Sequence, residues 1–148
     1  MAPFIVLATL FALLSILGHL QIPVAFGWWT SLRLALAGMF LLTASAHWGI
    51  RRPDLIRMVP TSFPRPDILI TVTGVLEVLG AIGLMLPKFA AYAALGLAFM
   101  LVAVFPANIR AAREHLTIAR RPVPTLLPRT LLQIVFLAAT IAVFVAGK

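Results

Sequence analysis

The chain has no cysteine and very little negative charge, with four acidic residues against twelve Lys and Arg. Without cysteine, it can form no disulfide, thiolate nucleophile, cysteine-ligated zinc site or iron–sulfur cluster. Charged residues of either sign make up 11% of the 148 residues, whereas a soluble domain has about a quarter. This shortage of charge argues against a soluble enzyme and against a disordered tail.

Apolar residues are abundant instead, at 62% of the chain. A chain this short buries the smaller part of its surface on folding, so much of this apolar mass has to stay on the outside. A lipid bilayer is the solvent that accepts such a surface. The composition therefore predicts an integral membrane protein.

Five apolar runs have about the length of a transmembrane helix, which needs roughly 17–25 residues at a rise of ~1.5 Å per residue. They cover residues 3–20, 32–48, 68–86, 89–109 and 130–146. We predict an all-α fold, a polytopic transmembrane bundle that forms a single integral membrane domain over residues 1–148. We expect the first run to be a retained helix rather than a cleaved signal peptide, because its first residues carry no basic side chain.

Nine of the twelve cationic residues lie in two alternate loops. The first loop contains Arg51, Arg52, Arg57 and Arg65, and the second contains Arg110, Arg113, Arg120, Arg121 and Arg129; Arg33, Lys88 and Lys148 lie elsewhere. The positive-inside rule predicts that both loops and the N-terminus are cytoplasmic and that the C-terminus is outside the cell (inner) membrane. The basic total is then a topology signal that allows contact with anionic lipid, and it predicts no nucleic-acid partner.

Glu77 is an acidic residue at the centre of the third run. An ionisable group inside a span costs at least ~2.5–3.5 kcal/mol on insertion scales, so it is expected to face the bundle interior. Its neighbours at three and four residues along a helix are small or weakly polar, including Thr73 and Gly74. Glu77 is interpreted as a proton-carrying or ligand-binding carboxyl, and the alternative is a neutral side chain that joins two helices by hydrogen bonds.

Three further polar residues are candidates for the same site. His47 lies one residue inside the cytoplasmic end of the second run, and Arg33 lies fourteen residues before it, close to the same helical face. If that face meets Glu77, the three residues form one polar seam; the alternatives are an interfacial anchor for His47 and a snorkelling side chain for Arg33. Asn108 follows Pro106 at the end of the fourth run, where it is expected to cap the helix or to reach His47.

Two helix signals lie near the ends of these runs. Asp67 is predicted to be the N-cap of the third span. Arg57 and its apolar neighbours are predicted to form a short interfacial helix. Small residues at helix-packing spacing predict close helix contacts in the last two spans, at Ala90, Ala94 and Ala98 and at Ala138, Ala142 and Ala146.

Three segments in order resemble the DoxX family of small bacterial and archaeal membrane proteins. Residues 39–48 end in a small residue, histidine and an aromatic residue; residues 73–84 carry the pattern Gly-x-x-Glu-x-x-Gly-x-x-Gly; and residues 104–108 read Val-Phe-Pro-Ala-Asn. The resemblance runs from Leu32 to Val145. It implies a four-helix DoxX-like core preceded by one extra N-terminal transmembrane helix, and it carries over onto His47, Glu77 and Asn108.

The family takes its name from a subunit associated with a thiosulfate:quinone oxidoreductase. The resemblance therefore implies an accessory subunit of a quinone-linked membrane redox complex, with quinone as the cofactor and a redox subunit as the partner. Two other functions stay open: a binder or carrier of a small lipophilic or protonatable ligand, and an assembly or structural factor without catalysis. Membrane lipids and further copies of this chain are the other expected partners.

A stand-alone enzyme is the least supported function, because the sequence has no nucleophile arrangement, cofactor motif or metal-binding pattern. His47 and Glu77 together supply at most two metal ligands, so no metal site is expected.

Overall fold

The structure is a computed structural model that describes residues 2–20 and 27–147; Lys148, counted above among the cations, lies outside this part. The described residues form six helices and one two-stranded hairpin. The elements are α1 (Ala2–His19), α2 (Trp28–Ser45), α3 (Arg52–Met58), α4 (Pro66–Met85), α5 (Ala90–Arg113), β1 (Thr117–Ile118), β2 (Arg121–Pro122) and α6 (Leu126–Ala146). The predicted all-α helical bundle is confirmed, and each of the five apolar runs forms a long helix.

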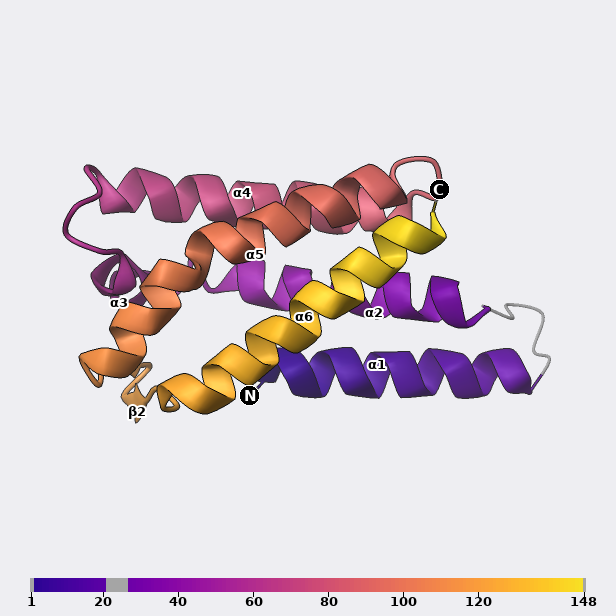
Figure 1. The fold of residues 1–148 in the computed structure, drawn as a ribbon, viewed down its shortest axis with the longest axis horizontal. Helices are drawn as coiled ribbons and strands as arrows, with labels where there is room; N and C mark the ends of the chain where they lie inside the picture. The colour runs from indigo at the N-terminus through magenta and orange to yellow at the C-terminus, as the bar shows by residue number, and fades with distance from the viewer. Residues whose placement is uncertain (1, 21–26, 148) are drawn as a thin grey trace.

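The long helices pack as a chain of neighbours, as Figure 1 shows. Helix α1 packs on α2, α2 on α4, α4 on α5 and α5 on α6, and α6 also contacts α2. Helix α3 and the hairpin lie together with the end of α5 and the start of α6 at one end of the bundle. This end therefore collects both arginine-rich segments.

Four helices are long and apolar enough to cross a membrane: α1, α4, α5 and α6. Helix α2 is not one of these four, since it begins with Trp28 and Trp29 and carries Arg33. It is nevertheless deeply packed, with seven buried residues. Large apolar side chains are exposed on the outer faces of all five long helices, as expected of a membrane protein whose surface contacts lipid.

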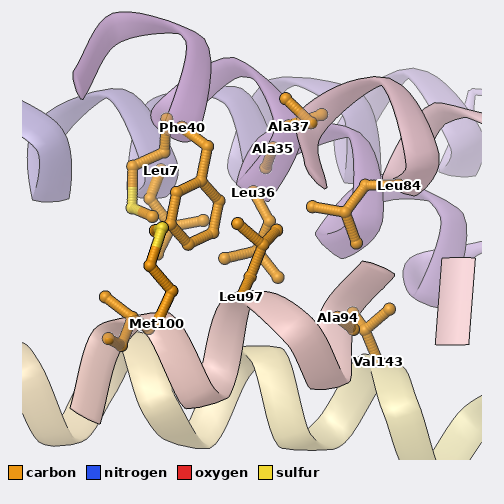
Figure 2. Close-up of a cluster of buried hydrophobic side chains, with 13 residues drawn as sticks. Leu7, Ala35, Leu36, Ala37, Phe40, Leu84, Ala94, Leu97, Met100 and Val143 are labelled. Carbon is orange, nitrogen blue, oxygen red and sulfur yellow. The ribbon is translucent and has the colours of Figure 1, made fainter. Parts of the chain in front are cut away.

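The apolar core lies where α2 faces α5. Figure 2 shows Leu36 and Phe40 of α2 meeting Leu97 and Met100 of α5, with Leu7 of α1 beside them. Phe40 and Leu36 are almost completely buried, and because lipid is as apolar as these side chains their contribution is van der Waals packing.

The small-residue prediction is right for α5 and wrong for α6. Ala90, Ala94 and Ala98 are buried as expected, but Ala138 and Ala146 are exposed. The buried residues of α6 are Gln133, Thr140 and Val143. The polar side chains decide which face of α6 turns inward, because an amide or hydroxyl in lipid would lack hydrogen-bond partners.

Three predicted helix ends are wrong. Helix α2 ends at Ser45, so His47 and Trp48 lie in the turn that follows. Helix α5 continues through Pro106 to Arg113; it bends in its second half (Figure 1), as a proline that removes one backbone donor allows. Asp67 is not an N-cap: Pro66 begins α4, and the N-cap is Arg65 in the left-handed conformation.

The two elements at the arginine-rich end differ in how well the sequence predicted them. Helix α3 forms the short helix expected around Arg57. The hairpin was not predicted. Its two central residues, Ala119 and Arg120, both have positive φ, a conformation that hairpin turns usually give to Asn or Gly, so the turn has no sequence signal.

A glycine contact between α4 and α5 yields a stability prediction. A Cβ atom added to Gly83 would lie 2.7 Å from the Cβ of Ala93. Neither atom can rotate away, so Gly83→Ala has to separate the two helices and should cost about 1–3 kcal/mol of unfolding free energy. Thermal unfolding followed by circular dichroism in detergent measures this loss.

Gly96→Ala is the matched control, because a Cβ atom there would meet nothing within 4 Å. Removing a helix glycine without a clash should stabilise the protein by about 0.5–1 kcal/mol. Equal unfolding temperatures for the two variants would contradict the close contact at Gly83.

Candidate functional site

A cavity of about 500 Å³ lies between α2, α4, α5 and α6, toward the arginine-rich end of the bundle. Most of its lining is apolar, including Met39, Phe40 and Phe136. The polar and charged residues of the lining are Thr43, His47, Arg51, Thr73, Glu77, Asn108, Arg129 and Gln133. Three of the four predicted site residues, His47, Glu77 and Asn108, therefore line one cavity.

Glu77 and His47 face each other across the contact between α4 and the turn after α2. His47 Nδ1 lies 3.7 Å from Glu77 Oε2, and only 10% and 12% of the two side chains is exposed. Glu77 Oε2 is buried, and no described group forms a hydrogen bond with it. A buried carboxyl oxygen without a hydrogen bond carries a desolvation cost of ~1–3 kcal/mol or more that no described group offsets.

The imidazole of His47 is held by backbone groups. Its Nδ1 lies 3.2 Å from the Thr43 carbonyl, and its own carbonyl accepts a 2.8 Å hydrogen bond from Arg52. The same guanidinium reaches Thr71 on α4. With the hydrogen on Nδ1 donated to Thr43, Nε2 is left as the acceptor.

Gly74 is what allows His47 to come this close to α4. A Cβ atom at Gly74 would lie 2.7 Å from Cβ and 2.8 Å from Cγ of His47. Since Gly74 is three residues before Glu77 on the same helix face, the imidazole of His47 lies against the glycine and beside the carboxyl.

Asn108 has a different role from the one predicted. No described hydrogen bond joins it to a helix end or to His47; its Oδ1 accepts a hydrogen bond from the guanidinium of Arg129 on α6. The prediction failed because α5 continues beyond Pro106, which places Asn108 inside the helix. The Asn108–Arg129 pair connects α5 to α6 across the cavity.

Gln133 also connects these two helices. Its Nε2 donates to the backbone carbonyl of Leu101, shortly before the proline of α5. Gln133 is buried, and its carboxamide gives the Leu101 carbonyl a hydrogen bond close to the bend of α5.

Arg33 does not join this site. It lies in the first turns of α2, fourteen residues before His47 and so about 21 Å along the helix, and it is not part of the cavity lining. Its Nε is buried, with no hydrogen-bond partner among the residues that the structure describes. The predicted seam of Arg33, His47 and Glu77 is therefore reduced to the last two residues.

Sequence reasoning missed Arg129, Gln133 and Thr43 as parts of the site. Arg129 had been assigned to a loop, whereas it lies in the first turn of α6. One signal was available: Arg129 and Gln133 are four residues apart at the start of an apolar run, which places them on one helix face.

Helix α3 and the hairpin lie over the arginine-rich end of the cavity and contribute Leu55, Met58 and Ile118 to its wall. Asp54 of α3 holds them together, because its Oδ2 accepts a 2.8 Å hydrogen bond from the Ala119 backbone N–H. The backbone N–H of Ala119 and the Arg57 guanidinium lower the pKa of Asp54 from its ordinary value of 3.8.

In the part of the chain that the structure describes, no group of three or more His, Asp or Glu side chains is placed to hold a metal ion. The geometry defines a helical membrane-protein bundle with an internal cavity that is apolar along most of its wall and carries an acid–imidazole pair.

Comparison with known proteins gives the family. Residues 36–146, most of the chain, match the family described as "Domain of unknown function (DUF8561)", and the chain belongs to this family. The matched region includes the whole cavity wall except the part contributed by α1. No curated protein and no solved structure matches the chain.

The close approach of His47 to α4 can be tested by substituting Gly74. Gly74→Ala should push His47 away from Glu77 and change the surroundings of Trp48, whose ring lies next to that of His47. We expect a shifted Trp48 emission maximum in a variant that lacks Trp28 and Trp29. Gly96→Ala in the same background is the control, and an unchanged emission in Gly74→Ala would contradict the close approach.

The Asp54 contact predicts a pH dependence of the hairpin. Because the folded-state pKa of Asp54 lies below 3.8, the stabilisation is fully present above that value and is lost as the pH falls through the lower, folded-state value. Hydrogen exchange of residues 117–122, corrected for intrinsic rates, should therefore accelerate only in acid.

Asp54→Asn should accelerate the same exchange at neutral pH, since the charged acceptor is gone. Asp67→Asn is the matched control, because the Asp67 side chain takes part in no described hydrogen bond and only its backbone carbonyl does. Identical exchange in the two variants would show that Asp54 does not hold the hairpin.

Proposed function

We propose that this DUF8561 protein binds a small lipophilic molecule with a polar head in the cavity between α2, α4, α5 and α6. The observation that carries the proposal is the buried Glu77 Oε2, which has no described hydrogen-bond partner and lies beside His47 on the wall of a cavity of about 500 Å³. Ligand sites are typically concave, mostly apolar and supplied with a few convergent polar groups, and this cavity has each property.

The apolar and the polar parts of the cavity lining contact different parts of the ligand. Apolar side chains such as Phe40 and Phe136 contact the lipophilic part of the ligand, at about 25 cal/mol per Å² of apolar surface removed from water. Glu77 and His47 meet the polar head. Either residue can accept a hydrogen bond from the ligand, His47 at Nε2 and Glu77 at the Oε2 that has no described hydrogen-bond partner.

A quinone-linked accessory subunit is the second candidate function. An imidazole beside a carboxyl is suited to the reduced, quinol form of a quinone head, whose hydroxyls donate hydrogen bonds to these two acceptors. This reading agrees with the resemblance of residues 39–48, 73–84 and 104–108 to the DoxX family. It requires a redox partner, since this chain has no cysteine and none of its motifs binds a redox cofactor.

We also propose that the arginine-rich end of the bundle is cytoplasmic in the cell membrane, with the C-terminus outside. The gathering of α3, the hairpin and the end of α5 at one end (Figure 1) supports this orientation under the positive-inside rule. The cavity then opens toward the cytoplasmic side.

The test begins with native mass spectrometry of the full chain, extracted gently from its own membrane. We expect a retained small molecule in wild type and in Glu114→Gln, and its loss in Glu77→Gln. Glu114 is the matched control because its carboxyl is half exposed, pairs with Arg110 and lies outside the cavity. A retained redox subunit would support the second candidate.

Added ligand is tested by fluorescence with Trp48 as the remaining tryptophan. A short-chain ubiquinol, whose hydroxyls donate hydrogen bonds, should quench Trp48 with a saturable concentration dependence that is weakened about tenfold or more in Glu77→Gln, for the loss of one hydrogen bond to a charged group. Bulk lipid alone in the mass spectrum, together with no saturable binding of any lipophile, would overturn the proposal in favour of an assembly role.

A further inference from the structure

We infer that the cavity selects a lipophilic anion, and that Arg129 is the residue that binds its acidic head. The inference rests on the proposed function and names the class of ligand. The expected ligand is a single-chain amphiphile whose acidic end, a carboxylate or a phosphate monoester, binds Arg129, and whose adjacent hydroxyl donates to the Glu77–His47 pair.

Arg129 is a half-buried cation on the cavity wall without a counter-ion. Among the described residues, Arg57 pairs with Asp54 and Arg110 with Glu114, and Arg129 belongs to neither ion pair. The single acidic residue of the lining, Glu77, lies beside His47 instead. A desolvated guanidinium without an anion is costly.

The position of Arg129 along α6 adds to this cost. It lies in the first turn of the helix, where the backbone dipole is positive, and this turn contains no acidic residue. A cation is disfavoured there and an anion is favoured. An anionic ligand would relieve both penalties at once.

The guanidinium is also held in place. Its Nη2 donates to Asn108 Oδ1, which fixes one edge of the planar guanidinium. A guanidinium has five N–H donors, and a carboxylate or phosphate takes two of them in parallel. Arg51, which is exposed on the same lining, adds a second positive charge at the rim of the cavity.

The competing explanation is structural: Arg129 only ties α6 to α5 through Asn108. Two substitutions separate the explanations. Arg129→Gln keeps an amide donor for Asn108 and removes the charge, whereas Asn108→Asp keeps the contact and supplies an internal counter-ion. Arg113→Gln, at an exposed arginine outside the cavity, is the matched control.

The experiment measures binding of radiolabelled dodecanoate to the full chain in nanodiscs of phosphatidylcholine, with unlabelled dodecyl phosphate, dodecanol and a short-chain ubiquinone as competitors. We expect dodecyl phosphate to compete about 10- to 100-fold better than dodecanol, the range for charge-assisted hydrogen bonds. The preference should persist in Arg113→Gln and disappear in Arg129→Gln and in Asn108→Asp.

Two results overturn the inference and leave the proposed function standing. The first is that dodecanol or the ubiquinone competes as well as dodecyl phosphate in wild type. The second is that the preference for the anion survives in both Arg129→Gln and Asn108→Asp. The wild-type comparison needs no variant, so it holds even if a variant fails to fold. If none of the four compounds binds, the proposed function itself falls.

A second set of nanodiscs distinguishes the two sources of the anion. Replacing part of the phosphatidylcholine by phosphatidylglycerol should weaken dodecanoate binding to wild type if a lipid phosphate occupies the site. Unchanged binding supports a free amphiphile as the ligand. Weakened binding would overturn the assignment to a single-chain amphiphile and leave a lipid phosphate as the anion at Arg129.

Discussion

Three glycines of α4 let its backbone approach its neighbours closely, and the packing of the bundle depends on this. Gly74, Gly80 and Gly83 bring the helix backbone against His47, Leu97 and Ala93 in turn, at distances that a Cβ atom would not allow. Helices in a membrane gain little from apolar burial against each other, so the close van der Waals packing that small residues allow holds them together. Glu77 lies between Gly74 and Gly80 in the same run of spaced residues. Close packing and the candidate site are therefore consequences of one sequence pattern.

The bundle is packed tightly at one end and is hollow toward the other. Leu36, Leu97 and Val143 fill the interior on one side (Figure 2), and the cavity occupies the side nearer the arginine-rich end. Pro106 lies at the change between the two: α5 bends in this region, and Gln133 and Arg129 of α6 bind it on either side of the proline, at Leu101 and Asn108. Hydrogen bonds between α5 and α6 therefore border the cavity. The polar groups that line it are ones that a closely packed apolar core could not accommodate.

The sequence predicted the helices and two residues of the site more reliably than their contacts. Glu77 and His47 were recognised because an ionisable group in an apolar run is costly wherever the helix packs, and the structure brings the two together. Asn108 was recognised but given the wrong partner, since a proline inside a long helix bends it instead of ending it. Arg129 was assigned to a loop because its burial depends on α5, which lies far from it in sequence. The hairpin had no signal, since Ala119 and Arg120 are not residues that favour positive φ.

Helix α1 lies outside the region that matches the family and packs mainly on α2. Its first residues, Ala2 and Pro3, nevertheless form part of the cavity wall. Helix α1 therefore has fewer protein contacts to lose than the other four long helices when it shifts. Under the proposed function, such a shift would expose the cavity to the acyl chains of the surrounding lipid, which would let a ligand dissolved in the bilayer enter beside α1.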